Sequence, residues 1–305
     1  MRNYYKYLPV TETEKKWGFY LTTVGYTKIE PKDNYPTKGH PSTHTFTWNK
    51  GRILNGYYIV FISQGKGVFE SDKTIPSVVS EGTCFFLFPH IWHRYKPDIN
   101  LGWEEFWVGF NGSYPDHIMN KYFFDPETPF VNVGLNEPLL ILFNRLLEAV
   151  QHASHGYSQI ISGITLEILG LVHAISKHIE QSENPVQQLI SKAMFLLRKS
   201  LDQPVNMKNL AKELLMSYSK FRKEFKNITG FSPYEYHLTL RINMSKELLN
   251  STTLNIGEIA CQTGFESVFY FSKLFKRKVG LSPKHYRLQG KTHRISCSPG
   301  ISFKQ

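Results

Sequence analysis

GFSPYEY at residues 230–236 and GLSPKHY at residues 280–286 lie fifty residues apart and share the order Gly, apolar, Ser, Pro, two variable positions and Tyr. Glycine accepts the left-handed backbone conformation that often ends a helix, and a proline soon after it prevents the helix from continuing. Proline is also well tolerated in the first turn of a new helix. Each segment therefore predicts the end of one helix and the start of another.

The similarity extends upstream of both segments. Phe221 and Phe225 are one helical turn apart and return fifty residues later as Phe271 and Phe275. Further upstream the spacing slips by one residue, because Leu210-Ala211 matches Ile259-Ala260, which indicates a length change in a turn. Each copy therefore predicts a helix, a short turn and a second helix. The second helices are expected over Ser217–Ile228, with Phe221, Phe225 and Ile228 in the core, and from Glu266 or Ser267 to Lys278.

Two helices joined by a short turn form a helix-turn-helix unit, whose second helix can enter the major groove of DNA. The segment between the two units, Tyr234–Asn250, carries apolar residues on one helical stripe. We expect it to form one long helix that links the units rigidly. A rigid link matters because tandem units must meet grooves about one DNA turn apart, ~34 Å.

Positive charge is concentrated in the same part of the chain. Residues 1–188 contain 16 Lys and Arg against 18 Asp and Glu, whereas residues 189–289 contain 17 against 7, a net charge of +10. The last sixteen residues add three positive charges, which completes the +11 of the whole chain. A basic block of domain size is typical of a nucleic-acid binder, although a solvated basic face would give the same excess.

Residues 189–289 resemble the DNA-binding domain of the AraC/XylS family of transcription regulators. The resemblance covers a third of the chain, and two helix-turn-helix units in register make it specific. It is carried by Leu210-Ala211, Ser217, Phe221, Phe225-Lys226, Gly230-Phe231-Ser232-Pro233, Tyr236, Arg241, Leu248-Leu249, Ile256, Ile259-Ala260, Gly264-Phe265, Phe271, Phe275-Lys276, Gly280-Leu281-Ser282-Pro283 and Tyr286.

The resemblance implies which side chains meet DNA. Ser219, Arg222 and Lys223 would face base edges, and Arg222 could contact guanine with two hydrogen bonds. Phe269 departs from the polar residue often found at its position, so it would either contact a thymine methyl group or belong to the core. The full candidate set is Ser217, Tyr218, Ser219, Arg222, Lys223 and Lys226 in the first unit, and Ser267, Val268, Phe269, Ser272, Lys273 and Lys276 in the second.

The N-terminal part has a different pattern. Short runs rich in aromatic and β-branched residues alternate with Gly and Pro, which favours strands over residues 56–62, 67–70, 83–88 and 103–110, with a turn at 63–67. Strands of this spacing predict a small barrel or jelly roll. Two apolar-faced helices follow, over Leu139–Val150 and Ile160–Ile179. The predicted fold class is therefore α+β, with a β-barrel or jelly roll, trailing helices and an all-α tandem helix-turn-helix domain.

The N-terminal part also resembles, more loosely, the cupin-like sensing domain of sugar-responsive AraC-type regulators such as the arabinose regulator. The supporting residues are Val24–Thr27, Gly56-Tyr57, Gly65–Gly67, Glu81-Gly82, Phe88-Pro89, His93, Tyr95, Trp103 and Trp107. The resemblance implies a small-molecule pocket in the barrel and dimerisation through the following helices. The implied domains are 1–136 for sensing, 137–180 for dimerisation, 181–188 as linker, 189–289 for DNA binding and 290–305 as a flexible basic tail.

The strand around Trp103 offers a candidate effector site. By alternation Trp103, Glu105 and Trp107 share one face. Two indoles beside a carboxylate suit a sugar, because its C–H face packs on aromatic rings and its hydroxyls donate to the acid. These residues could equally be barrel core with a surface acid. With the positions that the resemblance implies, the candidate effector set is Thr27, Arg52, His93, Tyr95, Trp103, Glu105 and Trp107, and Arg52 requires a gap in the alignment.

Other functions find less support. A metal-dependent cupin enzyme needs a converging histidine and glutamate set, which His40, His44, His90 and His93 do not match in spacing. No nucleophile motif, P-loop or dinucleotide fingerprint is present, so no enzyme activity or cofactor is expected. A DNA alkylation-repair protein would need clustered cysteines, whereas Cys84, Cys261 and Cys297 are scattered.

No apolar run of membrane-spanning length and no signal peptide are expected, which favours a cytoplasmic protein. The sequence thus predicts a homodimeric transcription regulator. Its expected partners are double-stranded promoter DNA, a sugar effector and RNA polymerase. A non-sugar effector, or none, is left open.

Overall fold

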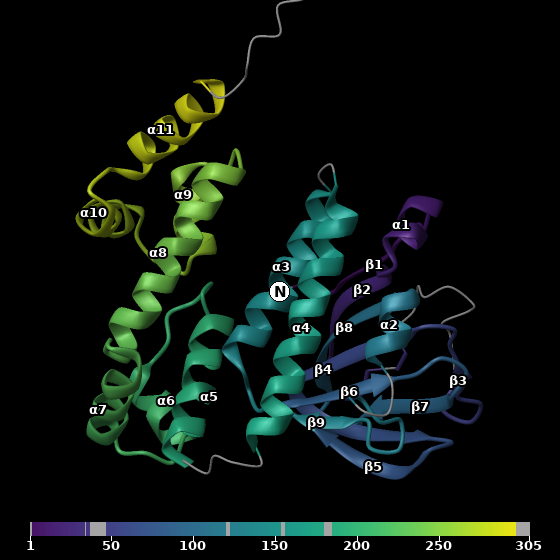
Figure 1. The fold of residues 1–305 in the computed structure, drawn as a ribbon. Helices are drawn as coiled ribbons and strands as arrows, with labels where there is room; N and C mark the ends of the chain where they lie inside the picture. The colour runs from purple at the N-terminus through teal and green to yellow at the C-terminus, as the bar shows by residue number, and fades with distance from the viewer. Residues whose placement is uncertain are drawn as a thin grey trace, which may run out of the picture. The chain divides into compact units, whose positions relative to one another are not determined.

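The computed structural model describes residues 2–33, 35–36, 47–119, 123–153, 156–179 and 185–296. The chain divides into two compact units, Met1–Asn184 and Pro185–Gln305. Figure 1 shows that the described strands all belong to the first unit and that the described part of the second unit is helical. The predicted α+β fold class is confirmed.

The first unit is a rolled antiparallel sheet. Its strand order is β1-β2-β8-β4-β6-β9, and β4 also pairs with β5 and β7, while β7 pairs with β3. The long strand β4 makes the roll, because its first half pairs with β8 and β6 and its second half with β7 and β5. The strands are β1 (Tyr4–Tyr7), β2 (Tyr20–Ile29), β3 (Arg52–Ile53), β4 (Tyr57–Ser71), β5 (Thr74–Ser80), β6 (Thr83–Leu87), β7 (Trp92–Pro97), β8 (Trp103–Asn111) and β9 (Phe130–Asn132).

The predicted turn at residues 63–67 is wrong, because β4 runs through this segment. The register shifts between Ile62 and Gln64, and Gly65 has a φ of 85°. A side chain at Gly65 would lie 2.3 Å from the carbonyl oxygen of Gly102, so the glycine allows β4 to pass close to the start of β8. The glycines that suggested a turn instead mark an irregularity within one strand.

Helices cover the outer face of the sheet. α3 (Glu137–His152) and α4 (Tyr157–Ile179) pack on each other and on β2, and the shorter α1 (Glu12–Trp17) and α2 (Ser113–Ile118) lie at the sheet margin. Phe143 of α3 stacks on Phe61 of β4 with ring centroids 6.0 Å apart. By length and composition α4 would qualify as a membrane span, contrary to the expectation from the sequence, yet it packs against α3 and β2 in this unit.

The second unit consists of two helix-turn-helix units joined by one helix. The first contains α6 (Met207–Glu213) and α7 (Tyr218–Thr229), and the second contains α9 (Ile256–Gln262) and α10 (Val268–Val279). α8 (Pro233–Ser251) connects them, with α7 near one of its ends and α10 near the other (Figure 1). The unit is completed by α5 (Pro185–Lys199), which packs on α7, and α11 (Pro283–Ser296), which packs on α8.

Each repeat has the same packing. Phe221 and Phe225 have ring centroids 5.6 Å apart, and Phe271 and Phe275 are 5.7 Å apart. The Tyr that ends each quoted segment then packs on the second Phe, Tyr236 on Phe225 at 5.4 Å and Tyr286 on Phe275 at 5.6 Å. Gly230 and Gly280 end the preceding helices with φ of 79° and 85°. The prediction that each segment ends one helix and starts the next is confirmed.

The length slip between the repeats lies in the second turn. Backbone bonds from Met216 to Ala211 and from Phe265 to Ala260 are equivalent, and Glu266 is the extra residue before the Ser267 cap. Glu266 therefore does not start α10. Leu215 and Gly264 both have positive φ, 54° and 71°, but a side chain at Gly264 would lie 2.7 Å from the amide nitrogen of Gln203. Only the second turn therefore requires glycine.

Two predicted segment bounds are wrong. The linker 181–188 ends earlier than predicted, because α5 begins at Pro185, while 181–184 lie outside the described residues. Residues 290–296 continue α11, so the predicted tail does not begin at residue 290, and 297–305 lie outside the described residues.

Candidate functional site

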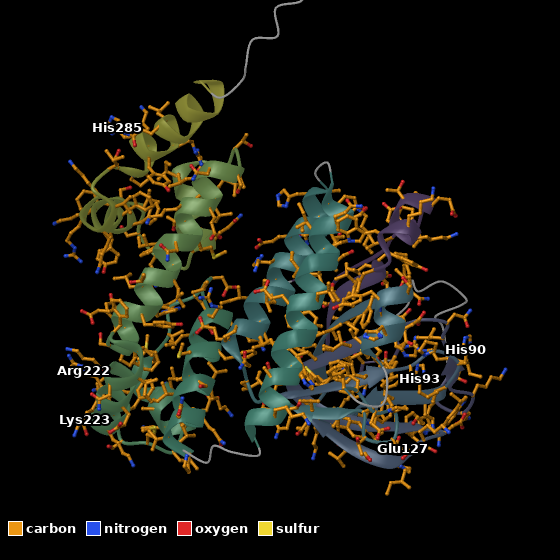
Figure 2. All side chains as sticks on the ribbon, viewed as in Figure 1. His90, His93, Glu127, Arg222, Lys223 and His285 are labelled. Atoms are coloured by element: carbon orange, nitrogen blue, oxygen red, sulfur yellow. The ribbon has the colours of Figure 1, made fainter. Side chains whose placement is uncertain are left out.

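The first recognition helix, α7, presents a polar and basic face. Ser217 caps it by accepting a hydrogen bond from the backbone of Lys220 at 3.3 Å. Phe221 and Phe225 are fully buried, and Figure 2 shows Arg222 and Lys223 on the outer side of α7. All six candidates of this unit are exposed: Ser217, Tyr218, Ser219, Arg222, Lys223 and Lys226. Ile228 is 45% exposed, so its predicted core position is wrong.

The second recognition helix, α10, presents a more apolar face. Phe269 is 79% exposed and Val268 46% exposed, which excludes the core position that the sequence left open for Phe269. Lys273 and Lys276 are exposed as well, whereas Ser272 is half-buried. Ser267 caps the helix by accepting from the backbone of Tyr270 at 3.3 Å. The two recognition helices therefore offer DNA different chemistry.

α8 holds both helix-turn-helix units. Its buried Arg241 donates to the Thr263 carbonyl in the second turn, and its guanidinium lies 4.0 Å from the centre of the Phe265 ring. Near its start, Tyr236 packs on the first unit, while Leu238, Ile242 and Leu249 enter the core of the second. Because one helix contributes to both cores, the two recognition helices cannot move independently without disturbing that packing.

The effector candidates lie inside the barrel. Glu105 on β8 pairs with Thr27 on β2 and with Ile62 on β4, so these side chains share the inner face of the sheet. Trp103 is buried in the same core, and Trp107 packs against that core. The indole of Trp107 lies over Gly25, where a side chain would be only 2.2 Å from it. The predicted alternation of β8 is confirmed by this packing.

Glu105 is a buried acid. The hydroxyl of Tyr35 donates to its carboxylate at 3.3 Å from each oxygen. Burial raises the pKa of Glu105 to about 8, against the opposing effects of the Tyr35 hydrogen bond and of Arg52. Since the side chain is 6% exposed, the possibility of a surface acid is excluded. At neutral pH this carboxyl can both donate and accept hydrogen bonds.

Arg52 is the second polar group of this region, and its charge acts on the pKa of Glu105. Arg52 donates from Nη2 to the hydroxyl of Tyr95 at 2.6 Å and from Nε to Nε2 of His93 at 3.2 Å. Nδ1 of His93 lies 3.1 Å from the carbonyl of Ile91. Burial and the charge of Arg52 lower the pKa of His93 to about 3, so this imidazole is neutral. Its Nε2 can therefore accept from Arg52.

The barrel interior includes tyrosines that sequence reasoning missed. Tyr35 packs on Trp103 and Tyr95 with ring centroids 5.8 and 6.0 Å away. Tyr7 and Tyr58 lie near enough to Arg52 for its charge to act on their pKa values, which burial raises. Alternation along β4 could have placed Tyr58 inward with Val60 and Ile62. No periodic apolar pattern surrounds Tyr35, which lies between β2 and β3 in the sequence.

Among the described residues, one buried donor in this region has no partner. The indole Nε1 of Trp103 makes no hydrogen bond to any described residue, although a buried N–H group normally has an acceptor. Trp103 belongs to the same core as Tyr95, with the half-buried Tyr35 packed against it. A hydroxyl-bearing ligand near these rings could supply the acceptor.

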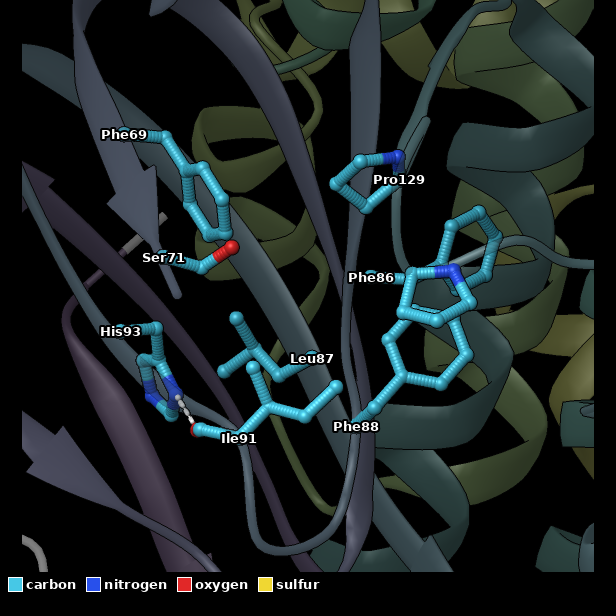
Figure 3. A pocket seen from close by; sticks show the side chains of 9 residues that line it. Phe69, Ser71, Phe86, Leu87, Phe88, Ile91, His93 and Pro129 are labelled. Carbon is cyan, nitrogen blue, oxygen red and sulfur yellow. Dashed lines mark hydrogen bonds between the residues drawn. The ribbon is translucent and has the colours of Figure 1, made fainter. Parts of the chain in front are cut away.

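His93 also lines a small pocket. Figure 3 shows Phe69, Leu87, Ile91 and His93 around it, and it has room only for a water-sized group. Its lining is mainly apolar and does not include Glu105 or Trp107. The pocket is therefore too small and too apolar to hold a sugar.

Within the described ranges, no three His, Cys, Asp or Glu side chains are arranged to hold a metal ion. His40 and His44 lie outside those ranges. Cys84 is buried and Cys261 exposed, both with free thiols. Cys297 also falls outside the described residues.

Comparisons with known proteins match both units. Residues 33–169 match the family described as AraC-like ligand binding domain, and residues 210–289 match the family described as helix-turn-helix domain. The Msm operon regulatory protein of Streptococcus mutans is 26% identical over 241 residues, which cover 77% of this chain and 85% of that protein.

Two further relatives match over similar lengths. The MmsAB operon regulatory protein of Pseudomonas aeruginosa is 25% identical over 261 residues, which cover 84% of this chain and 83% of that protein. The raffinose operon transcriptional regulatory protein RafR of Pediococcus pentosaceus is 25% identical over 252 residues, which cover 79% of this chain and 88% of that protein.

Proposed function

The chain belongs to the AraC family of DNA-binding transcription regulators, and from this premise we propose that its barrel binds a carbohydrate that controls transcription. The observation that carries the proposal is the set of buried Glu105 and Tyr95 and half-buried Arg52 beside the indoles of Trp103 and Trp107. Acid, guanidinium and phenol can hold sugar hydroxyls, and the aromatic rings can pack on sugar C–H groups. RafR, a relative, regulates a raffinose operon.

The contact of Tyr35 with Glu105 supports a position for the sugar beside Glu105. The Tyr35 hydroxyl already occupies hydrogen-bonding positions on both oxygens of Glu105. A sugar hydroxyl reaching Glu105 would replace the phenol, and another could accept from the N–H group of Trp103. Thr27 lies beside Glu105 in the register and completes the set of contacts.

For the second unit, we assign base contacts to Ser219, Arg222 and Lys223 of α7 and to Phe269 and Lys273 of α10. Their exposure on the first two turns of capped helices supports the assignment. Ser217 and Ser267, together with the helix N-termini, would hold phosphates. Lys226 and Lys276 lie further along the helices and would contact the DNA backbone.

The regulator would act as a homodimer in the cytoplasm and activate transcription through contact with RNA polymerase. The outer side of α4 supports dimerisation, because Ile160 is 52% exposed and both Gly163 and Gly170 face open space. A sugar would alter activity only if it binds one arrangement of the dimer better than another.

Tryptophan emission offers a direct test of the sugar proposal. All 5 tryptophans, Trp17, Trp48, Trp92, Trp103 and Trp107, belong to the first unit. Titration with a panel of mono- and oligosaccharides should change the emission and raise the melting temperature for at least one sugar. Trp107→Ala should abolish the response and leave DNA binding intact.

If no sugar in the panel gives a response, the carbohydrate proposal is wrong and a regulator with another effector, or none, takes its place. A response that survives Trp107→Ala would mean that the sugar binds elsewhere. A purified chain that turns over the sugar would point to an enzyme instead.

A further inference from the structure

Side chains on both faces of strand β7 contact one short segment of the chain. The segment is Trp48–Arg52, called here the strap, and it ends where β3 begins. The inward side chains of β7, His93 and Tyr95, accept hydrogen bonds from Arg52. The outward side chains Trp92, Arg94 and Lys96 contact the strap outside the barrel. Five consecutive residues of one strand therefore contact Trp48, Lys50 and Arg52 of the strap.

Arg94 is the centre of the outer contacts. Its Nε and Nη2 each lie 2.7 Å from Oε2 of Glu70, which fixes the plane of the guanidinium. Its Nη1 donates to the carbonyl of Trp48 at 2.9 Å, and its Cζ lies 4.4 Å from the centre of the Trp48 ring. Lys96 adds a second cation 4.3 Å from the same ring centre. Trp48 is thus held by a hydrogen bond and by two cation–π contacts.

The turn between Trp48 and Arg52 is tightly defined. The indole of Trp92 donates to the carbonyl of Lys50 at 2.8 Å. Gly51 has a φ of 60°, and a side chain there would lie 2.5 Å from the Trp92 indole. The strap therefore has little freedom to change its path between the anchored Trp48 and Arg52.

We propose that Arg94 is a positioning residue for effector binding: by holding Trp48 outside the barrel, it sets where the guanidinium of Arg52 lies inside. Arg94 is separated from the interior by the strand itself, because its side chain and that of Tyr95 point to opposite faces. The role in affinity rests on the proposed sugar site. The positioning of Arg52 does not, and it can be tested without any ligand.

The ligand-free test measures how readily phenylglyoxal modifies Arg52 in the folded full-length chain, by mass spectrometry of peptides. In the wild type the hydrogen bonds to Tyr95 and His93 should protect Arg52. Arg94→Gln keeps a polar side chain but removes the ion pair and the cation–π contact. We expect it to speed modification of Arg52 about tenfold, the order expected when one charge-assisted hydrogen bond and one cation–π contact are lost.

Two further variants separate positioning from general stability. Trp48→Leu leaves Arg94 and Glu70 in place but removes the ring, and it should expose Arg52 to a similar degree. Arg145→Gln is the matched control, since Arg145 pairs with Glu167 at 3.3 Å on the helices and not with the strap. It should leave the modification rate of Arg52 unchanged. Arg94→Lys retains the charge and should restore part of the protection.

Sugar titration of the same variants tests the consequence for binding. With a sugar that binds the wild type, Arg94→Gln should weaken affinity about tenfold and Arg145→Gln should not. If Arg52 stays protected in both Arg94→Gln and Trp48→Leu, the positioning role is refuted. If no sugar binds the wild type, the proposed function fails, but the modification rates still decide the role of Arg94.

Discussion

The hydroxyl of Tyr234, in the first turn of α8, lies 3.3 Å from the hydroxyl of Tyr270, in the first turn of α10. This contact joins α8, which follows the recognition helix α7, to the second recognition helix, α10. It adds to the buried bond from Arg241 to Thr263, which anchors α8 to the second turn. The spacing of α7 and α10 therefore depends on α8 and on the contacts made by its first turn and by its middle.

Arg222→Ala should relax base preference at one position of the DNA site. Arg222 is exposed on α7 and offers the paired donors that match guanine in the major groove. We expect a loss of about 1–3 kcal/mol for the preferred base and little change for other bases at that position. Selection of sites from a random duplex pool, followed by single-base competition, measures this. Unchanged selectivity would remove Arg222 from the base contacts.

The second half of the site should depend on thymine methyl groups. Phe269 is 79% exposed at the start of α10 and has no group that could form a hydrogen bond with a base. Replacing thymine by deoxyuridine in that half should therefore weaken binding severalfold, and Phe269→Ala should remove the difference. Deoxyuridine in the half bound by α7 is the control. Equal losses at both halves would contradict the assignment.

Because of two buried groups, the free energy of unfolding of the first unit should fall at both low and high pH. Burial raises the pKa of Glu105 from 4.5 to about 8, so its contribution to the free energy of unfolding is full below pH 4.5 and lost as the pH rises toward 8. Burial lowers the pKa of His93 from 6.5 to about 3, so its contribution is full above pH 6.5 and lost as the pH falls toward 3.

Glu105→Gln therefore should flatten the decline between pH 6.5 and 8, where Glu105 can contribute at most about 1.4 kcal/mol per pH unit and the contribution of His93 is already full. Urea unfolding followed by tryptophan emission reports on this unit. His93→Gln serves as the counterpart and should alter only the acid side. Identical pH profiles for the wild type and Glu105→Gln would show that Glu105 does not hold a proton in the folded chain.

Tyr35→Phe should strengthen sugar binding. The Tyr35 hydroxyl competes with the sugar for the oxygens of Glu105, and a hydrogen bond of this kind contributes about 1 kcal/mol. We therefore expect affinity to rise about fivefold, measured by titration of tryptophan emission. Weaker binding would mean that the Tyr35 hydroxyl contacts the sugar and does not compete with it.

The sequence predicted the second unit more completely than the first. The repeated Gly, Ser, Pro and Tyr positions each have a local role, as a helix end, a cap or a ring contact, so neighbouring residues suffice to place them. Ile228 was misplaced because a helical stripe does not reveal where the packing partner ends. The extra residue Glu266 changes the spacing between the two repeats by one. The sequence shows this change but does not show which residue causes it.

The barrel depends on contacts between distant residues. Glu105 could be placed with Trp103 and Trp107 by alternation, but Tyr35 meets it from seventy residues away. Glycines at 65 and 67 resemble a turn in sequence, although they allow close strand packing in β4. The strap was not predicted, because its contacts to β7 combine both faces of a strand with an irregular segment.

Base-by-base protection on a selected duplex tests the paired recognition helices most directly. At each half-site, where one full chain binds, guanine N7 methylation and thymine oxidation should reveal two protected major-groove patches on one side of the duplex, about 10 base pairs apart. Arg222→Ala should lose protection in one patch and Lys273→Ala in the other. A single protected patch, or two on opposite sides of the duplex, would contradict simultaneous binding by α7 and α10.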